Sequence, residues 1–323
     1  MLPIALDALG GDRAPGEILA GAHQAALEGI SVILVGPSGL EGCGELPLIE
    51  ANEFIDMDED AVQSVRHKKD STLVRAAEAV RDGKASAMVS AGNTGATMAS
   101  ALLRMGRMKG VKRPAIATAI PVPGSTPTIL LDSGANAEVQ PEWLVQFAQM
   151  GSVYAAHRFG IANPRVGLLS IGEEPIKGSP LVKETHKLLA IAKGINFIGN
   201  VEGRDVMTDT VDVVVTDGFT GNVLLKALEG SMRTLISALL EAFSSTPEYQ
   251  AHADALLPAL LPLYEKFDPE TYGGAVLLGV DGVCIISHGS SSSRAILNAL
   301  RVGKDLVDSG FVDALRASVA PPA

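Results

Sequence analysis

Short apolar runs alternate along the chain with longer segments in which apolar residues recur every three or four positions. The runs predict strands at 4–8, 31–36, 86–90, 114–120, 128–134, 165–172, 196–200 and 211–218. The helical segments lie beyond Pro15, at 71–83, near 141–159 and near 179–193. Ser71 and Gly83 are typical of a helix cap and a helix stop.

This alternation is typical of a mainly parallel sheet with helices on both faces. The chain shows neither a sequence repeat nor a low-complexity linker. We therefore expect an α/β/α sandwich with a large, mainly parallel sheet. We expect residues 1–323 to form a single bilobed α/β domain, since a chain of this length can bury a large core.

The pattern changes after residue 218. Apolar residues at 225, 228, 232, 235 and 239 follow steps of three and four, which predicts a long helix over 223–243. Such a stripe is either ordinary core or the seam of a dimer.

A second apolar stretch follows, with the sequence ALLPALLPLY at 255–264 and no charged residue. Pro258 and Pro262 argue against a long regular helix there. We therefore expect a helical projection near 220–270, in which 244–275 is a mixture of helix and loop. The stretch is either an apolar tip that lies in a membrane surface or a buried dimer contact.

Composition narrows the choice of partner and location. The net charge of −11 argues against nucleic acid, because neutralising phosphates requires a basic surface. Cys43 and Cys284 are too few for a disulfide framework and fit a reducing cytosol. The start, MLPIALDALGGD, shows no secretory signal, and no apolar run approaches the ~20 residues of a membrane span. We therefore expect a cytoplasmic protein.

Glycines and polar residues collect where six of the predicted strands end. They are Asp7, Gly10, Gly11 and Asp12; Ser90, Gly92, Asn93, Thr94 and Gly95; Asp132, Ser133 and Asn136; Glu173, Glu174 and Lys177; Asn200, Glu202 and Arg204; and Asp217, Thr220 and Asn222. In open α/β sheets, ligands bind outside the carboxyl ends of the strands. One such turn alone is commonplace. Six of them predict a site, and we expect them to converge on one edge of the sheet.

The familiar motifs of other enzyme classes are absent. The chain has no P-loop, no G-x-S-x-G and no H-E-x-x-H, and GPSGLEG at 36–42 lacks the spacing of a dinucleotide site. The six histidines show no metal-ligand spacing, so we expect neither a metal nor a cofactor. Only His288 follows an apolar strand into a Gly-Ser turn, where a structural role is as reasonable as a catalytic one.

Several segments together resemble the bacterial phosphate acyltransferase family. They are DALGGDRAP, RHKKDST, SAGNTGA, RPAIA, LLDSGAN, LLSIGEE, FIGNVEGRD, VVVTDGFTGNV, YGGAVLLGVDGV and IISHGSS, spread over nearly the whole chain. The resemblance implies transfer of an acyl group from acylated acyl carrier protein to inorganic phosphate, feeding phosphatidic acid and phospholipid synthesis. It also implies a fold similar to isocitrate dehydrogenase and phosphotransacetylase, a homodimer, peripheral membrane contact and a downstream membrane acyltransferase.

The implied reaction holds phosphate against a thioester carbonyl and stabilises an oxyanion. Phosphate is already an anionic nucleophile, so no catalytic Ser or Cys motif is needed. We interpret the turn at 91–95 as an anion cradle at a helix N-terminus. The catalytic candidates are Asn93, Lys177, Arg204, Asp217, Asn222 and His288. The substrate-binding candidates are Asp7, Gly10, Gly11, Asp12, Ser90, Gly92, Thr94, Gly95, Asp132, Asn136, Glu173, Asn200, Glu202 and Lys226.

Individual roles follow from side-chain chemistry. Lys177, Arg204 and Lys226 are the cations expected at the phosphate or the oxyanion, although Lys226 could equally be a surface residue of its helix. Asp132 and Asp217 are expected to orient donors. His288 is the candidate for protonating the departing thiolate.

Other readings remain open beside this one. A dehydrogenase of the isocitrate type would share the fold but would need nicotinamide and metal carboxylates at a defined spacing. A non-catalytic membrane scaffold would leave the polar strand ends without a role. The basic segment RMGRMKGVKR at 104–113 is either a docking site for the acidic carrier protein or a solvated loop beyond a helix C-terminus.

Overall fold

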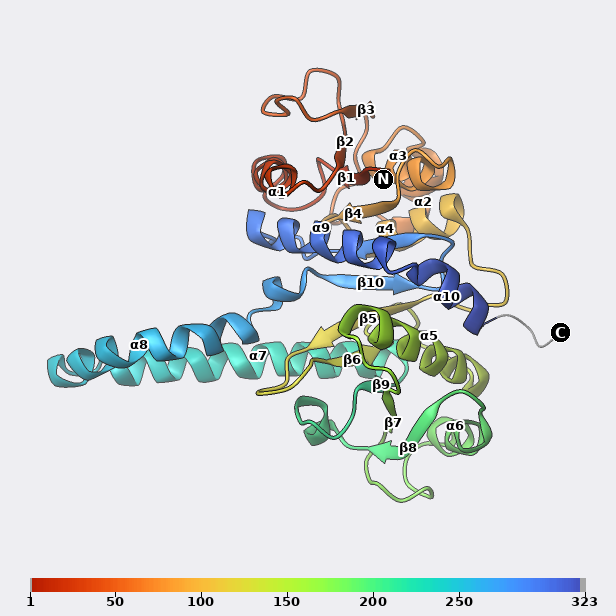
Figure 1. Ribbon diagram of the computed structural model, residues 1–323, viewed down its shortest axis with the longest axis vertical. Helices are drawn as coiled ribbons and strands as arrows, with labels where there is room; N and C mark the ends of the chain where they lie inside the picture. The colour runs from red at the N-terminus through yellow and green to blue at the C-terminus, as the bar shows by residue number, and fades with distance from the viewer. Residues whose placement is uncertain (1, 320–323) are drawn as a thin grey trace.

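Within residues 2–319, which the computed structural model describes, eleven strands form one sheet with helices on both faces (Figure 1). The strands are β1 (Ile4–Asp7), β2 (Val32–Gly36), β3 (Leu48–Glu50), β4 (Ala87–Ser90), β5 (Ala115–Ile120), β6 (Thr128–Leu131), β7 (Arg165–Leu169), β8 (Asn196–Val201), β9 (Val213–Val215), β10 (Ala275–Leu278) and β11 (Val283–Ile286). The α-helices are α1 (Gly16–Leu27), α2 (Ala61–His67), α3 (Thr72–Arg81), α4 (Thr94–Ser100), α5 (Pro141–Phe159), α6 (Pro180–Ile191), α7 (Gly218–Phe243), α8 (Pro247–Phe267), α9 (Ser293–Asp308) and α10 (Phe311–Ser318). Shorter segments are the π-helix η1 (Ala101–Met105) and the 3-10 helices η2 (Gly203–Met207) and η3 (Pro269–Tyr272).

The direction of the strands changes in the middle of the sheet. The order is β3-β2-β1-β4-β11-β10-β5-β6-β9-β7-β8. The first five strands are parallel to one another, and so are the last four. Three successive antiparallel pairings, β11-β10, β10-β5 and β5-β6, lie between these sets. The sheet is mainly parallel, as predicted, but its two parallel sets run in opposite directions.

Alternate side chains of each strand enter cores on opposite faces of the sheet. On one face, Leu6 and Val89 pack in a core with α1, α5 and α9. On the other face, Ala5 and Met88 pack in a core with α2, α3 and α4. A smaller core on this second face includes Leu130 of β6, with α7 and η2 packed against it. The predicted α/β/α sandwich is confirmed.

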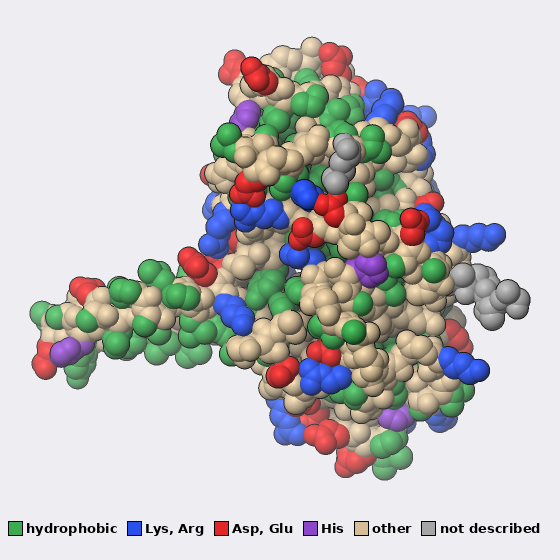
Figure 2. Space-filling view, viewed as in Figure 1, with side chains coloured by type: hydrophobic (Ala, Val, Ile, Leu, Met, Phe, Trp, Pro, Cys, Tyr) green, Lys and Arg blue, Asp and Glu red, His purple; other side chains and the backbone are tan. Residues whose placement is uncertain are grey.

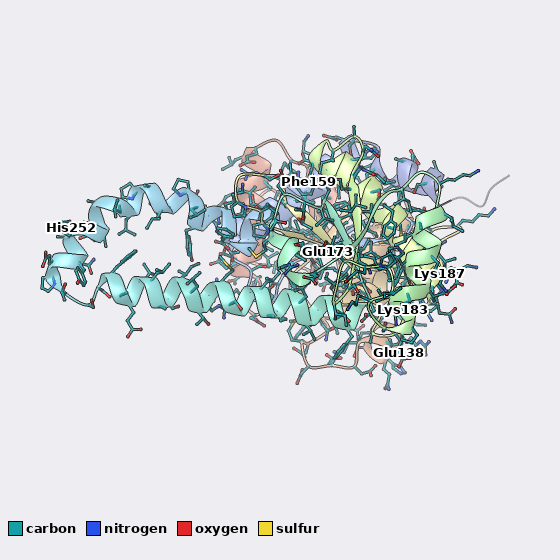
Figure 3. All side chains as sticks on the ribbon, turned by 90° about the horizontal axis from the view of Figure 1, so that it is seen from below. Glu138, Phe159, Glu173, Lys183, Lys187 and His252 are labelled. Carbon is teal, nitrogen blue, oxygen red and sulfur yellow. The ribbon has the colours of Figure 1, made fainter. Side chains whose placement is uncertain are left out.

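Helices α7 and α8 form a hairpin that projects from the sheet, with His252 near its far end (Figures 1 and 3). The expected projection near 220–270 is confirmed. The expectation that Pro258 and Pro262 interrupt its second helix is wrong, because α8 is continuous. Each proline removes an N–H from the helix ladder and leaves the carbonyl four residues earlier without its donor. Those carbonyls belong to Asp254 and Pro258, which are exposed, so solvent can supply the missing donors. No helix within residues 2–319 has the length and apolar character of a membrane span.

The base of α7 packs tightly against the end of β6. Asp217 caps the helix, because its Oδ1 accepts the N–H of Thr220 at 2.8 Å. A Cβ at Gly221 would lie 1.9 Å from the carbonyl oxygen of Asp132. Only glycine therefore lets the helix come this close. Gly230, in the middle of the same helix, has open space around it.

Two glycine substitutions in α7 test this close approach. Gly221→Ala should lower the free energy of unfolding by about 1–3 kcal/mol, because the added methyl group overpacks the contact. Gly230→Ala should raise it by about 0.5–1 kcal/mol, since alanine favours the helix and restricts the unfolded chain. Urea denaturation followed by circular dichroism measures both changes. Equal effects of the two substitutions would show that α7 is not held at Gly221.

Candidate functional site

A buried hydrogen-bond network joins the carboxyl ends of β1 and β4. Asp7 is 1% exposed, and the hydroxyl of Ser90 donates to its Oδ2 at 2.7 Å. The Ser90 oxygen accepts the N–H of Gly92 at 2.9 Å. Burial raises the pKa of Asp7, while hydrogen bonds from Thr72 and Ser90 act in the opposite direction. A Cβ at Gly10 would lie 2.4 Å from Asp7 Oδ2, so the turn after β1 closes over this carboxyl only with glycine.

The turn after β4 leads into α4, and Asn93 caps that helix. Its Oδ1 accepts the N–H of Ala96 at 3.0 Å, and its Nδ2 donates to the carbonyl of Met57 at 2.9 Å. The Asn93 side chain therefore holds backbone on both sides of the turn. The N–H groups of Thr94 and Gly95 have no hydrogen-bond partner among residues 2–319. Such groups at the start of a helix attract anions.

The end of β11 completes this corner of the sheet. The N–H of Asp12 donates to the carbonyl of Gly289 at 2.8 Å. The neighbouring His288 is exposed, and its Nδ1 lies 2.8 Å from the Ser290 hydroxyl. Ser287 Oγ is buried without a hydrogen-bond partner in the described part of the chain. The structure thus brings together a first group of predicted residues: Asp7, Gly10, Gly11, Asp12, Ser90, Gly92, Asn93, Thr94, Gly95 and His288.

Asp132 organises a second group where β6 and β9 end. Its two oxygens accept the N–H groups of Ile116, Gly134, Ala135 and Asn136 and the side-chain amide of Asn136, at 2.7 to 3.1 Å. Burial raises the pKa of Asp132, and these hydrogen bonds oppose the rise. The carboxyl is therefore fully occupied in shaping the loop that follows β6.

The first turns of α7 add two more predicted residues to the second group. The carboxyl of Asp217 accepts both the N–H and the hydroxyl of Thr220, each at 2.8 Å. Asn222 Nδ2 donates to the carbonyl of Ser133 at 3.1 Å, which joins α7 to the loop after β6. The second group therefore consists of Asp132, Asn136, Asp217 and Asn222.

A third group lies where β7 and β8 end. Arg204 forms ion pairs with Glu202 at 2.7 Å and with Glu173 at 3.6 Å. Asn200 is buried, and its Nδ2 donates to the carbonyl of Glu174 at 3.0 Å, which holds the loop after β7 against β8.

The three predicted cations differ in their pairing. Arg204 is 71% exposed beside its two carboxylates. Lys226 pairs with Glu229 at 2.7 Å, one turn along the same helix. Lys177 is exposed and has no ion pair with any carboxylate of residues 2–319. Exposed ion pairs contribute at most about 1 kcal/mol, so an anionic ligand competes readily with the partners of Arg204 and Lys226.

The expectation that all six strand ends converge on one edge of the sheet is wrong. The first group follows β1, β4 and β11, whereas the second and third follow β6, β9, β7 and β8. These two sets of strands run in opposite directions, so their carboxyl ends lie at opposite edges of the sheet. The reversal arises from the antiparallel strands β10 and β5, whose direction the apolar pattern does not reveal.

The first and second groups nevertheless share one face of the sheet. Ser90 of β4 lies opposite Ile286 of β11, and Ile286 lies opposite Ala275 of β10. The register of β10 with β5 then places Thr118 next to Ala275 in the same row across the sheet. The Thr118 hydroxyl lies 2.7 Å from the Ser133 hydroxyl, in the loop that Asp132 shapes. Ala275 and Thr118 are partly exposed although their strands are central. The polar groups therefore flank an accessible stretch of sheet at β10 and β5.

Thr72 and Thr118 are not among the predicted site residues, and Ser133 is predicted only as a polar residue at a strand end. Thr118 has a signal in the sequence, since it is the one polar residue in the apolar run PAIATAI. Ser133 adjoins Asp132, but its contact with Thr118 requires the pairing of β5 with β6. Thr72 contacts Asp7 from α3, and nothing local in the sequence joins these two segments.

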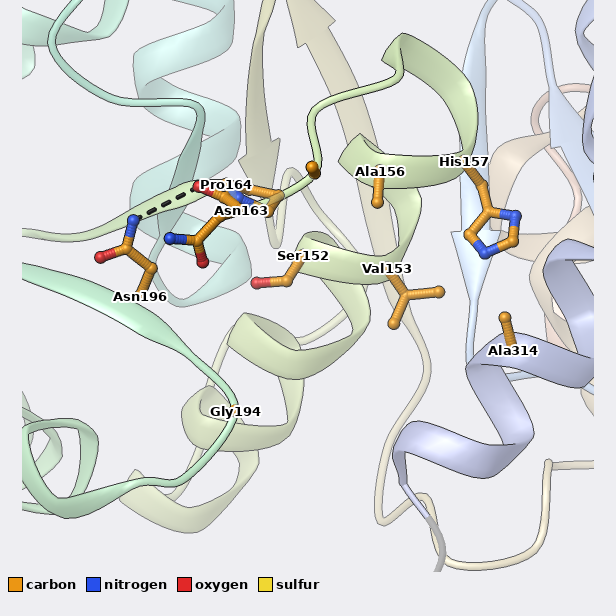
Figure 4. A pocket seen from close by; sticks show the side chains of 10 residues that line it. Ser152, Val153, Ala156, His157, Asn163, Pro164, Gly194, Asn196 and Ala314 are labelled. Carbon is orange, nitrogen blue, oxygen red and sulfur yellow. Dashed lines mark hydrogen bonds between the residues drawn. The ribbon is translucent and has the colours of Figure 1, made fainter.

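A hollow of about 230 Å³ lies away from all three groups (Figure 4). It is lined by Ser152, Val153, Ala156, His157, Ala162, Asn163, Pro164, Gly194, Asn196 and Ala314. Asn163 and Gly194 precede β7 and β8, so the hollow lies at the amino ends of these strands. Ligands of open α/β sheets bind at the carboxyl ends, and no charged side chain lines this hollow. We assign it no role in the site.

Most polar side chains of the site hold backbone turns in place. Among residues 2–319, no group of three or more His, Cys, Asp or Glu side chains is placed to hold a metal ion. The polar groups instead hold backbone, and the open donors are the N–H groups at the start of α4.

Solved structures similar to this one show the fold. A phosphotransacetylase from Streptococcus pyogenes superposes with a TM-score of 0.63 at 17% identity, covering 94% of each chain. A putative 4-hydroxythreonine-4-phosphate dehydrogenase from Salmonella typhimurium superposes with a TM-score of 0.56 at 11% identity, covering 95% of this chain and 99% of the other. The predicted likeness to phosphotransacetylase is confirmed, and dehydrogenases share the same fold.

Sequence comparisons show the family. The model of a family described as "Fatty acid synthesis protein" matches residues 2–314. A phosphate acyltransferase of Desulfitobacterium hafniense (strain Y51) is 48% identical, over 98% of this chain and 97% of its own length. Another, of Elusimicrobium minutum, is 49% identical, over 98% of this chain and 96% of its own length. The chain therefore belongs to the fatty acid synthesis protein family, together with these phosphate acyltransferases, and it is an acyltransferase.

Proposed function

We propose that the protein transfers an acyl group from acylated acyl carrier protein to inorganic phosphate, giving acyl phosphate and the free carrier. The names of the relatives support phosphate as the acceptor. The observation that carries the proposal is the pair of open N–H groups of Thr94 and Gly95, beside a partly exposed stretch of central sheet. The product would supply a downstream membrane acyltransferase in the synthesis of phosphatidic acid and phospholipid.

The chemistry needs a bound anion and no enzyme nucleophile. A phosphate oxygen attacks the thioester carbonyl carbon, a C–O bond forms, and the C–S bond breaks as the thiolate leaves. Backbone N–H groups at the start of α4 bind the phosphate. His288, exposed at the same corner, supplies the proton that the thiolate takes up.

The other predicted residues act mainly through the backbone in this proposal. Asp7 and Ser90 fix the turns after β1 and β4, and Asn93 fixes the start of α4. Asp132 and Asn222 fix the loop that faces the same stretch of sheet. The cations Lys177, Arg204 and Lys226 would then act at longer range or with a partner subunit.

A thiol-release assay tests the proposed function. The purified protein is incubated with acylated carrier protein, and free thiol is measured with and without inorganic phosphate. We expect release that depends on phosphate and saturates with it. Release that ignores phosphate would indicate a thioesterase, and nicotinamide reduction in a parallel assay would favour the dehydrogenase that the shared fold leaves open. Either result would overturn the proposal.

Asn93→Ala tests the turn after β4. Removing the cap should lower the free energy of unfolding by about 1 kcal/mol. It should also lower kcat/KM by roughly 100-fold, the usual loss when an anion-binding donor is displaced. Thr246→Ala is the matched control, because Thr246 caps α8 by accepting the N–H of Tyr249 at 3.2 Å, far out on the hairpin. Wild-type kcat/KM for Asn93→Ala would exclude this turn as the phosphate site.

We also propose that the protein is a cytoplasmic homodimer that associates peripherally with the membrane. Figure 2 shows hydrophobic side chains along the projecting hairpin. Its exposed large apolar residues include Leu235, Leu239, Leu240, Leu256, Leu260, Leu261, Leu263 and Tyr264. A second hairpin packed alongside would bury them. The stretch 255–264, for which a membrane tip and a dimer contact were both open, lies within α8 and not in the turn between the helices. This position favours the dimer contact for 255–264, so the proposed membrane association rests on the family resemblance and not on this stretch.

Leu260→Glu separates these two roles. A charge at this position should prevent burial against a second copy, so size-exclusion chromatography with light scattering should show a monomer. His252→Glu, which places the same charge on the exposed outer part of α8, should remain a dimer. If Leu260→Glu stays dimeric and loses sedimentation with liposomes, the stretch is a membrane contact instead.

A further inference from the structure

The loop between η1 and β5 displays a cluster of cations. We call residues 107–113 the basic loop. Its exposed side chains are Arg107, Lys109, Lys112 and Arg113, and it contains no acidic residue. Figure 2 shows basic side chains at the margin of the molecule where Figure 1 draws this loop. The cluster is unusual in a chain whose net charge is −11.

The basic loop is held in one shape by buried and hydrogen-bonded groups. Met108 and Val111 are buried, so apolar anchors alternate with the exposed cations. The N–H of Met108 donates to the carbonyl of Gly279 at 3.0 Å. Gln146 of α5 accepts the N–H of Lys112 at 2.8 Å and donates to the carbonyl of Gly110 at 2.9 Å. Because the backbone of the loop is already ordered, little conformational entropy is lost when a partner binds.

The charges of the basic loop are not neutralised within the chain. None of its four cations forms an ion pair with a carboxylate of residues 2–319. Arg113 lies over the ring of Trp143, 5.0 Å from its centroid, and Arg107 donates to the carbonyl of Lys112 at 2.7 Å. These contacts orient the two guanidinium groups and leave their charge intact. Such a surface attracts an acidic partner and speeds its association.

The basic loop is connected to the candidate site along two routes. One is the helical segment of seven residues in α4 and five in η1, which starts at Thr94 and ends next to the loop. Its length is roughly 18 Å. The other is Asn136, whose Nδ2 donates to the carbonyl of Pro114, directly after the loop, at 2.7 Å. The loop therefore lies at the rim of the region that the first and second groups flank.

We propose that the basic loop is the docking surface for the acidic carrier protein that delivers the acyl group. This inference rests on the proposed function and adds the place where the carrier binds. A carrier docked on the loop would extend its flexible prosthetic arm along α4 and the Asp132–Asn136 loop, with the thioester at the start of α4. The acidic body of the carrier would meet the loop, and only the arm would enter the site.

Charge reversal of Lys109 and Lys112 tests the docking surface. Neither ammonium group makes a hydrogen bond within residues 2–319, so the fold should tolerate Lys109→Glu with Lys112→Glu. The matched control is Lys187→Glu with Lys193→Glu on and beyond α6, which changes the net charge equally. Each variant is assayed with acylated carrier protein and with an acyl-N-acetylcysteamine thioester, which is small and uncharged. Binding of the unacylated carrier is measured separately by titration calorimetry at two salt concentrations.

We expect the loop variant to lose at least 10-fold in kcat/KM with the carrier substrate and to keep its kcat/KM with the small thioester within about 2-fold. Carrier binding should weaken and lose its salt dependence, while the control variant keeps both. Equal losses with the two thioesters, or equal losses in the control variant, would overturn the docking site. If the wild-type protein uses neither thioester, the proposed function fails, and the calorimetry still decides whether the carrier binds the basic loop.

Discussion

The buried carboxyl of Asp132 is the contact on which the second half of the molecule depends. It collects five hydrogen bonds and so fixes the loop after β6 against β5. This loop is the surface on which α7 begins, since Cβ atoms at Gly218 and Gly221 would both collide with it. Leaving a buried acceptor unsatisfied costs about 1–3 kcal/mol. The position of α7, and with it that of the whole hairpin, therefore depends on the hydrogen bonds that the loop donates to Asp132.

Asp7 is the corresponding buried carboxyl in the first half of the molecule, where it holds the turns after β1 and β4. It is buried at the end of β1, receives the Ser90 hydroxyl, and is covered by a glycine turn that no larger residue could make. In both halves a buried carboxyl accepts hydrogen bonds from the turn around it. The outer side of each turn then presents mainly backbone. The two constructions face one another across β10 and β5, where Thr118 and Ser133 meet. An acyl-transfer site between them would be lined by main chain, which needs no catalytic side-chain motif.

The sequence predicts most of the longer elements of this fold, misses β3, β10 and α2, and predicts the relations between elements only in part. Periodicity locates strands, α5 and α6, because burial and helix geometry act over a few neighbouring residues. It cannot reveal that β10 and β5 reverse the direction of the sheet. The pairing partner of each strand is set by the tertiary packing and not by the strand's own sequence. It likewise finds Asn93 but not its bond to Met57, because the carbonyl that receives its amide lies 36 residues away. The predicted break at Pro258 is wrong because α8 projects from the sheet and its backbone is exposed to solvent, which the local sequence does not reveal.

An acidic chain that handles anions must do so through local charge. At physiological ionic strength, charges are screened over about 8 Å, so the net charge of −11 acts weakly at any one point of the surface. In the proposed function, the donors at the start of α4 and the unpaired cations of residues 107–113 act within that distance. Where carboxylates outnumber cations locally, they repel an anionic partner over the same short distance. Specificity for an acidic carrier would thus come from one fixed basic loop on an otherwise repelling protein.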